Sequence, residues 1–401
     1  MILCRNCSSS RLEGVLDLGD QPWGNNFIPI DQYSEIPRYP LQLYFCHECS
    51  MIQLGYTVPK EVMFLDHQYV SSTTRSLRNH FSLIRDKIMS RAVFKQGEYA
   101  LDIGGNDGTF LSLFKDKGVG VLNVDSGHLQ ARLSEAAGVP CVNKFFNETT
   151  AREIRDAKGP ARIVHGSGIF FHLEELHSAF RGIKQLLAPD GLLVAEFIYL
   201  PEMVRNTAFD QIYHEHLLYY TLHSFNNVLG RHGLAIHDAE LVPIHGGSCI
   251  AYIKHAQSAA PTPALSTLLD AERMYNDIAP YQQFAENTMH LRDKLVAMVA
   301  DIRGRGLTIQ ALGAPVKGST ILNYCKFTER DIDCAVEINE HKCNTYYPGT
   351  MIPVYHQKSV GPPDVYLLLA WNFKDEILPK LGDFRKSGGK ILVPIPEPEL
   401  L

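Results

Sequence analysis

Two Cys-x-x-Cys pairs near the start of the chain most limit how it can fold. The first pair is Cys4 and Cys7, and the second is Cys46 and Cys49. A Cys-x-x-Cys turn points two thiolates at one ion, and two such turns complete a closed tetrahedral site with no open position for catalysis. The sequence therefore predicts a structural Zn²⁺ that ties both ends of this segment together.

A redox dithiol and a chance occurrence are the alternatives to zinc. A redox Cys-x-x-Cys usually lies at a strand-to-helix turn, and position 4 comes too early for one. Zinc would replace a hydrophobic core that residues 1–80, with several prolines, build poorly. The other five cysteines show no pairing, and we expect small buried apolar side chains at these positions: Cys141, Cys249, Cys325, Cys334 and Cys343.

The overall composition is that of an ordinary globular protein. Of 401 residues, 45% are hydrophobic and 20% are charged, with a formal net charge of −6, which argues against disorder or a coiled coil. A basic excess that would favour nucleic acid is missing, and no apolar stretch is long enough to span a bilayer. The first residues lack the pattern of a signal peptide. We therefore expect a cytoplasmic protein of two or three domains.

Residues 95 to 255 alternate short apolar runs with amphipathic stretches, the pattern of a βαβ sheet. The expected strands are Tyr99–Ile103, Val119–Val124, Ala161–Val164 and Gly191–Phe197. The expected helices are Gly108–Lys117, His128–Ala137, Glu174–Leu187 and Leu222–His232.

A long helical zone follows at Pro261–Gly304, and Pro280 is expected to break it into two helices. A second βα pattern then begins. Its expected strands are Leu307–Leu312, Val365–Leu369 and Lys390–Val393, and its expected helices are Ala314–Cys325 and Asn372–Leu381.

A glycine-rich loop, residues 102–108, joins the first predicted strand to the first helix. Gly104 and Gly105 allow a tight turn and the close approach of a ligand. The loop lacks the dinucleotide pattern Gly-x-Gly-x-x-Gly and resembles the Asp/Glu-x-Gly-x-x-x-Gly loop of S-adenosylmethionine-dependent methyltransferases. The alternative is a degenerate nucleotide-binding fold.

An acid at the end of the next strand strengthens this interpretation. Asp125 comes 21 residues after Gly104, where a carboxylate can accept hydrogen bonds from both ribose hydroxyls. Residues 143–146 would flank the adenine; the alternative is that the aromatic side chains there belong to the core. The predicted methyl-donor residues are Asp102, Gly104, Gly105, Asn106, Asp107 and Asp125.

Histidines and acids concentrate at residues 210–216. His214, Glu215 and His216 do not form the zinc-protease pattern His-Glu-x-x-His, and their alternation is too tight for two ligands on one helical face. His172 follows the expected strand Ala161–Val164, at the edge of the sheet where ligands bind. Acid–base chemistry is favoured over ordinary structural histidines, with His214 as a bystander.

Together these parts resemble the zinc-containing sugar C-methyltransferases, the keto-deoxysugar C-3 methyltransferases of the tylosin and tetronitrose type. The resemblance covers nearly the whole chain, and the order of its motifs is specific. Besides the cysteines and the glycine-rich loop, they are residues 69–72 (Tyr-Val-Ser-Ser), 213–216 (Tyr-His-Glu-His), 245–248 (His-Gly-Gly-Ser), 313–318 (Gly-Ala-Pro-Val-Lys-Gly), 347–350 (Tyr-Pro-Gly-Thr) and 370–373 (Ala-Trp-Asn-Phe).

The resemblance implies methylation at carbon 3 of a thymidine-diphospho-4-keto-6-deoxysugar through an enolate. It makes His216 the base that removes the proton, which suits an imidazole because its ordinary pKa is near neutrality. Glu215 would orient this base or bind a sugar hydroxyl. His172 and Tyr213 would serve the carbonyl oxygen, and Tyr69 would reach in from the zinc-binding segment.

Two positions depart from the family pattern: Gly168 stands where an Asn is common, and Ile250 where an Arg is common. Both changes bear on contacts with the sugar or its phosphates. In the C-terminal part, a helix start with Lys317 can hold a diphosphate, which makes Lys317 a predicted substrate-binding residue. The alternative is a solvated lysine at the start of a helix.

The sequence thus predicts an α/β protein in three parts. Residues 1–80 form a zinc-binding module that contacts the substrate, and residues 81–258 form a Rossmann-like methyltransferase fold for S-adenosylmethionine. Residues 259–401 form a helical bridge and a Rossmann-like domain that lacks the glycine fingerprint and binds the nucleotide sugar. We expect a monomer. The alternatives are an O- or N-methyltransferase acting on another nucleotide sugar or small molecule, and a non-catalytic binding module.

Overall fold

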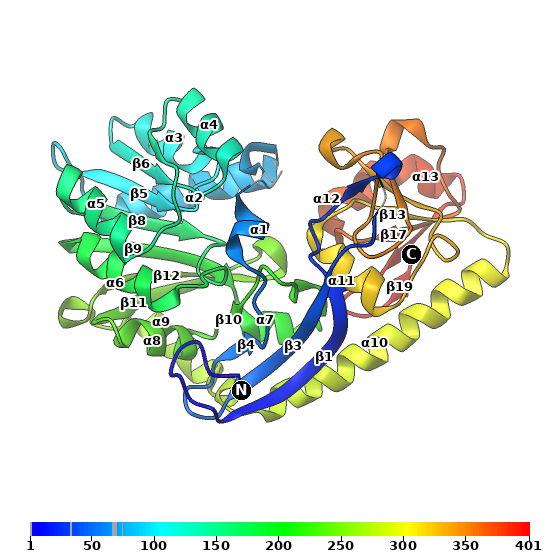
Figure 1. Ribbon diagram of the computed structural model, residues 1–401, viewed down its shortest axis with the longest axis horizontal. Helices are drawn as coiled ribbons and strands as arrows, with labels where there is room; N and C mark the ends of the chain where they lie inside the picture. The colour runs from blue at the N-terminus through cyan, green and yellow to red at the C-terminus, as the bar shows by residue number, and fades with distance from the viewer. Residues whose placement is uncertain (1, 33, 66–69, 74) are drawn as a thin grey trace.

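The computed structural model describes residues 2–32, 34–65, 70–73 and 75–401. These residues form a seven-stranded, an eight-stranded and a four-stranded sheet. The two larger sheets lie in separate lobes, and the long strands of the smallest sheet run beneath one lobe toward the other (Figure 1). Within this described part, no helix is both long and apolar enough to cross a membrane.

The seven-stranded sheet has the order β11-β12-β9-β8-β5-β6-β7. Its strands are β5 (Tyr99–Ile103), β6 (Gly120–Val124), β7 (Cys141–Val142), β8 (Ala161–Ser167), β9 (Leu187–Ile198), β11 (Leu234–Val242) and β12 (Ser248–His255). All pairings from β9 to β7 are parallel, and β12 runs antiparallel to both neighbours. β5 is buried along its whole length, because layers cover both faces of the sheet.

Helices cover both faces of this sheet. They are α2 (Arg75–Arg91), α3 (Thr109–Lys115), α4 (His128–Ala136), α5 (Glu148–Lys158), α6 (Leu176–Leu186) and α8 (Leu222–Gly230), whereas α7 (Leu200–Arg205) packs in the core shared by the N-terminal sheet and the C-terminal lobe. α2 and α3 pack in a core with Ile163, whereas α5, α6 and α8 pack in a second core with Val164. The neighbouring residues Ile163 and Val164 point to opposite faces, as the alternation along a strand requires. The predicted strands are confirmed, but the strands β7, β11 and β12 and the helices α2, α5 and α7 were not predicted.

The four-stranded sheet joins the zinc-binding segment to the larger lobe. It is antiparallel and contains β1 (Leu12–Pro22), β3 (Arg38–Cys46), β4 (Ile52–Leu54) and β10 (Leu218–Tyr219). β10 begins two residues after His216. The segment with the predicted catalytic residues is therefore held in place by the N-terminal sheet. The helix α1 (Lys60–Phe64) follows this sheet.

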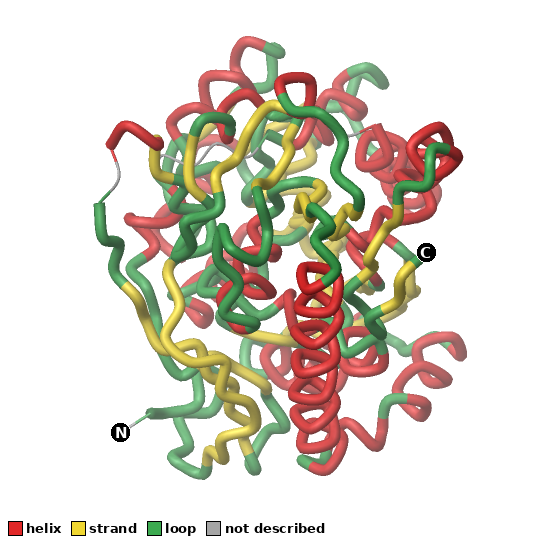
Figure 2. The backbone as a smooth tube through the Cα atoms, turned by 90° about the vertical axis from the view of Figure 1, so that its right-hand side faces the viewer, coloured by secondary structure: helices red, strands yellow, loops and turns green. Residues whose placement is uncertain are grey.

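The helical bridge consists of α9 (Pro263–Ala271), the 3₁₀ turn η6 (Arg273–Asn276) and α10 (Ala279–Gly304). Pro280 lies in the first turn of α10, where its missing N–H removes no helical hydrogen bond. The predicted division into two helices is confirmed. α10 runs along one side of the molecule between the two lobes (Figures 1 and 2).

The eight-stranded sheet has the order β19-β18-β17-β13-β14-β16-β15-β2. Its strands are β2 (Ile28–Pro29), β13 (Ile309–Leu312), β14 (Cys334–Glu337), β15 (Thr345–Tyr346), β16 (Pro353–His356), β17 (Val365–Leu368), β18 (Lys390–Val393) and β19 (Glu399–Leu400). The strands from β18 to β16 are parallel. β2 comes from the N-terminal segment, so this segment adds a strand to the C-terminal lobe.

The C-terminal lobe is Rossmann-like, and no glycine fingerprint joins β13 to α11 (Val316–Tyr324). The helix expected at 372–381 is instead a series of short turns. These are η9 (Trp371–Phe373), α12 (Lys374–Ile377) and η10 (Leu378–Leu381), followed by α13 (Gly382–Lys386). Pro379 lies at the start of η10, where it prevents one continuous helix.

Candidate active site

The predicted donor loop lies at the carboxyl end of β5. Gly104 and Gly108 have φ values of +68° and +75°, which side chains other than glycine rarely adopt. At Gly105, a Cβ atom would lie 2.5 Å from Asn123 Oδ1 and 2.8 Å from Asp102 Oδ2. The sharp turn from β5 into α3 therefore depends on these glycines.

Asp125 closes the loop from the end of β6. Its Oδ2 accepts a hydrogen bond from the Asn106 N–H at 2.9 Å, and its Oδ1 accepts one from the Gly127 N–H at 2.8 Å. Burial raises the pKa of this carboxyl group to about 6. Each carboxylate oxygen has a second lone pair, so Asp125 can still accept hydrogen bonds from a ribose.

Asp102 supports the loop from within the lobe. Its Oδ1 lies 2.7 Å from Nδ1 of His165, and the His165 ring stacks on Phe110 with a centroid distance of 3.8 Å. Asp102 and His165 are both buried. The carboxylate therefore links β5 to β8, and its direct contact with a methyl donor stays a prediction.

Asn106 and Asp107 hold the segment that leads into α2. The Ser71 N–H donates to Asn106 Oδ1 at 3.0 Å, and the Ser72 N–H donates to Asp107 Oδ2 at 3.0 Å. Part of the predicted motif at residues 69–72 therefore lies against the donor loop. Tyr69 itself lies outside the described residues, and its catalytic role stays a prediction.

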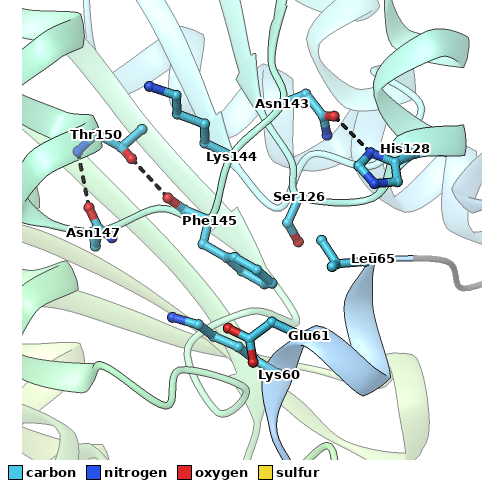
Figure 3. A pocket seen from close by; sticks show the side chains of 10 residues that line it. All are labelled: Lys60, Glu61, Leu65, Ser126, His128, Asn143, Lys144, Phe145, Asn147 and Thr150. Carbon is cyan, nitrogen blue, oxygen red and sulfur yellow. Dashed lines mark hydrogen bonds between the residues drawn. The ribbon is translucent and has the colours of Figure 1, made fainter.

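A cavity of about 350 Å³ opens between α1 and the segments that follow β6 and β7 (Figure 3). The residues around it are Lys60, Glu61, Leu65, Ser126, His128, Asn143, Lys144, Phe145, Asn147 and Thr150. Three of them come from α1 and the residue after it, and the others follow β6 and β7. Lys60 Nζ lies 4.8 Å from the centroid of the Phe145 ring. The segment expected to flank an adenine therefore lines a cavity shared with the N-terminal module.

His216 is buried between β10 and the 3₁₀ turn η3 (Phe209–Gln211). Its Nδ1 lies 2.8 Å from the backbone oxygen of Gln211. Because a carbonyl oxygen only accepts, Nδ1 carries the proton and the neutral ring has its lone pair on Nε2. Burial, with a smaller effect of His172, holds the pKa of His216 well below its usual value of 6.5. A neutral His216 can therefore accept a proton.

His172 lies beside His216, with 5.1 Å between the ring centroids. Its Nδ1 donates a hydrogen bond to the backbone oxygen of Glu215 at 2.7 Å. Phe64, the last residue of α1, packs edge-on against the His172 ring at 5.2 Å. His172 is thus positioned both by the segment that carries His216 and by the N-terminal module.

Tyr213 and Glu215 complete this cluster. The ring centroid of Tyr213 lies 3.9 Å from that of His216. Glu215 Oε1 accepts a hydrogen bond from the indole N–H of Trp23 at 2.7 Å, and burial raises the pKa of Glu215 to about 7. The structure therefore brings the rings of His216, Tyr213 and His172 together, and Glu215 joins them through its backbone oxygen.

His214 has a separate environment. Its Nε2 donates to the backbone oxygen of Tyr39 at 3.2 Å, and the two rings pack edge to face. This contact with β3 of the N-terminal sheet is consistent with a bystander in the chemistry.

Lys317 lies at the start of α11 and is enclosed. Its Nζ is 3.4 Å from Asp210 Oδ2 and 4.5 Å from the centroid of a Trp371 ring. The indole N–H of Trp371 donates to the same Asp210 oxygen at 2.6 Å. Only 12% of the Lys317 side chain is exposed. The alternative of a solvated lysine does not describe this structure, and substrate binding by Lys317 stays a prediction.

The four predicted zinc ligands meet at the end of the N-terminal sheet. Their sulfur atoms all lie within 4.8 Å of one another, with 3.5 Å between Cys4 and Cys49 and between Cys7 and Cys46. Tetrahedral Zn–S bonds of about 2.3 Å would place the sulfurs roughly 3.8 Å apart. Four thiols at this spacing fit a structural zinc ion.

The two cysteine turns share one backbone shape. Each is followed by a serine with positive φ, Ser8 at +61° and Ser50 at +55°. The N–H of each serine donates to the carbonyl oxygen of the first cysteine of its pair, at 2.9 Å in both cases. This repeated turn points both thiols of a pair in the same direction.

Three protein-family models match the chain, in the same order as its three predicted parts. A zinc binding domain matches residues 4–64, a methyltransferase domain matches residues 76–239, and a C-methyltransferase C-terminal domain matches residues 243–396. C-methyltransferase NovU from Streptomyces niveus is 31% identical over 404 residues, covering 99% of this chain and 96% of the relative. The chain belongs to the C-methyltransferase family. It is an S-adenosylmethionine-dependent C-methyltransferase with an α/β fold and an N-terminal zinc-binding cluster.

Solved methyltransferase structures resemble less than half of this C-methyltransferase. One from Anabaena variabilis is 14% identical with a TM-score of 0.36, covering 44% of this chain and 85% of the other. One from Mesorhizobium loti is 15% identical with a TM-score of 0.33, covering 42% and 95%.

Sequence reasoning missed three residues at the predicted catalytic cluster of the C-methyltransferase: Trp23, Phe64 and Lys342. Lys342 donates to the backbone oxygen of Ala314 at 2.8 Å, and its charge lowers the pKa of Glu215 against the effect of burial. Trp23 is 192 residues from Glu215 in the sequence. No local pattern marks these residues, because their importance depends only on what they contact.

One methyl group added to the donor loop is expected to weaken the binding of S-adenosylmethionine. The Gly105→Ala variant should bind S-adenosylmethionine at least about tenfold more weakly, because the new Cβ must displace Asn123 or Asp102 from a packed interior. Isothermal titration calorimetry measures the affinity. In the matched control, Gly230→Ala, a Cβ meets nothing within 4 Å. Equal affinities for both variants would contradict the assigned donor loop.

Proposed function

We propose that this C-methyltransferase methylates carbon 3 of a nucleotide-linked 4-keto-6-deoxysugar, with thymidine diphosphate as the expected nucleotide. S-adenosylmethionine supplies the electrophilic methyl group. The ketone makes the neighbouring C–H acidic, so removal of that proton by His216 would produce an enolate whose carbon takes the methyl group as the S–CH₃ bond of the donor breaks and S-adenosylhomocysteine leaves. The observation that carries this proposal is the neutral, buried His216 with its Nε2 lone pair.

The residues around His216 support separate roles. His216 would remove the proton at carbon 3, which requires a base positioned within hydrogen-bonding reach. The Tyr213 hydroxyl and a protonated His172 would donate hydrogen bonds to the ketone oxygen, which becomes negative in the transition state. Glu215 would accept a hydrogen bond from a sugar hydroxyl and so orient the ring.

The start of α11 is the proposed region for the diphosphate. Backbone N–H groups at the first turn of a helix attract an anion, and Lys317 adds positive charge beneath that turn. Its ammonium group is enclosed beside Asp210, so we propose an electrostatic contribution rather than a direct contact. Lys342 brings a second ammonium group close to Glu215.

We propose that residues 1–80, 81–258 and 259–401 act as one unit on this substrate. The boundary at residue 80 falls inside α2, and the parts exchange strands, since β10 joins the N-terminal sheet and β2 joins the C-terminal sheet. Trp23, Glu215 and Lys342 bring all three parts to one carboxyl group. A single chain therefore supplies every proposed group, which supports a monomer.

The proposed function is tested by incubating the protein with S-adenosylmethionine and a panel of nucleotide-linked sugars. The panel pairs each 4-keto-6-deoxysugar with its 4-hydroxy counterpart. Mass spectrometry should find one added methylene mass for a keto sugar alone, and carbon NMR with a labelled methyl group should place it on carbon 3. Donor binding without methylation of any keto sugar would overturn the substrate class. Methylation of the hydroxy counterparts would favour an O-methyltransferase.

A further inference from the structure

Trp23 connects the zinc-binding module to the catalytic cluster. It follows β1 directly, and its indole N–H donates to Glu215 Oε1 at 2.7 Å. The next residue, Gly24, packs closely on α11, because a Cβ there would lie 3.1 Å from the Val316 oxygen and 3.3 Å from Ser319 Cβ. The Trp23 backbone is therefore held between the two lobes, and the indole has a defined position.

Glu215 has few other partners. Within the described part of the chain, Trp23 is the only side chain that hydrogen-bonds its carboxyl group, so Oε2 accepts no hydrogen bond from these residues. The charged group that acts on it is Lys342 from the C-terminal lobe, whereas the His172 ring bonds to the Glu215 backbone oxygen and not to its carboxyl group. One oxygen is thus held by the indole, and the other remains for a ligand.

We propose that Trp23 is a positioning residue for the methylation reaction, because its indole N–H holds one oxygen of Glu215 and turns the other toward a substrate hydroxyl. The inference deepens the proposed function and rests on it for the role of Glu215. It makes the zinc-binding module part of the active site as well as a folding unit.

The N-terminal sheet connects the four-cysteine cluster to Trp23, which lies at the opposite end of β1. β1 and β3 pair from Leu12 opposite Cys46 to Pro22 opposite Arg38. An 11-residue strand spans roughly 35 Å. The zinc cluster is at one end of this ribbon, and Trp23 follows the other end. A zinc ion in this cluster would fix one end of the ribbon, whose other end holds the Trp23 indole against Glu215.

The Trp23→Phe variant tests the proposal, since it keeps an aromatic ring and removes the donor. A hydrogen bond to a charged group is worth about a ten- to hundredfold effect on an equilibrium or rate, and we expect kcat/KM to fall by this factor. The indole also favours the ionised carboxylate against burial. If Glu215 must be ionised, kcat/KM of the wild type should rise with pH to a plateau, with a midpoint near pH 7. In the variant, the midpoint of this rise should lie about one pH unit higher.

Two further variants separate positioning from folding. The Glu215→Gln variant should lose the rise of kcat/KM near pH 7. The double variant with Trp23→Phe should have the same pH profile as Glu215→Gln alone. Tyr44→Phe is the module control, because it removes a hydrogen bond from Tyr44 to Gln42 on β3, and it should keep the wild-type profile. A folded Trp23→Phe enzyme with wild-type zinc content, rate and pH profile would overturn the proposal.

Fluorescence gives a readout that needs no turnover. The chain has two tryptophans, and only Trp23 contacts Glu215 among the described residues. Wild-type emission should titrate with a midpoint near pH 7, and Glu215→Gln should lose this transition while keeping any signal of Trp371. The same emission in both proteins would overturn the contact. If the transition is present but no keto sugar is methylated, the proposed substrate fails and the Trp23–Glu215 contact stands.

Discussion

The His216→Asn variant is expected to methylate its keto sugar about a hundred- to ten-thousandfold more slowly than the wild type. Asparagine can still donate to the Gln211 carbonyl that now accepts from Nδ1, but it has no basic nitrogen in place of Nε2. Affinity for S-adenosylmethionine should stay unchanged, since the donor loop belongs to another element. Steady-state kinetics and calorimetry measure the two quantities separately.

Proton exchange isolates the step assigned to His216. In D₂O without the methyl donor, the wild type should exchange the proton at carbon 3 of the keto sugar, and His216→Asn should not. The matched control is His214→Asn, two residues away, because His214 contacts Tyr39 and should exchange at the wild-type rate. A His216→Asn enzyme with full activity would mean that another group is the base, and would favour O- or N-methylation.

Replacing one zinc ligand should have the largest effect on stability. Structural zinc binding contributes on the order of 10 kcal/mol in small zinc domains, which is comparable with the whole folding free energy of an ordinary domain. We expect Cys46→Ser to lower the zinc content from about one ion per chain to nearly none, to expose the N-terminal sheet to proteases and to abolish methylation. Elemental analysis, limited proteolysis and the activity assay measure these effects.

Cys343→Ser is the control for zinc loss. Cys343 is partly exposed and lies outside the four-cysteine cluster, so its variant should keep zinc and activity. A Cys46→Ser protein with wild-type zinc content would disprove the assigned ligands. Full activity of a Cys46→Ser protein that has lost its zinc would disprove the link between the zinc-binding module and the active site.

The strongest local patterns predicted the elements that carry them. The turn at Gly104 and Gly105 follows from their spacing between an apolar strand and a helix, and the structure contains this turn. The cysteine pairs likewise predicted one four-thiol cluster. These predictions succeeded because a tight turn needs particular residue types at particular positions, whatever surrounds it.

Elements with weaker sequence patterns were not predicted, or were cut by a predicted domain boundary. α2 crosses the expected boundary at residue 80, and the two-residue strand β7 is too short for a visible alternation. Lys317 offered no way to distinguish a solvated side chain from an enclosed one. Its burial depends on Asp210 and Trp371, which other segments bring to it.

Local residue patterns were enough to predict three chemical features of this protein: a zinc cluster, a methyl-donor loop and a group of histidines with a neighbouring acid. Each depends on residues that are close together in the chain. Which side chains share one site depends on how distant segments pack against one another. Trp23, Glu215 and Lys342 lie on three separate segments, and they meet because β10 and β2 are exchanged between sheets. Burial at that meeting point, which no local pattern encodes, raises the pKa of Glu215 and lowers that of His216.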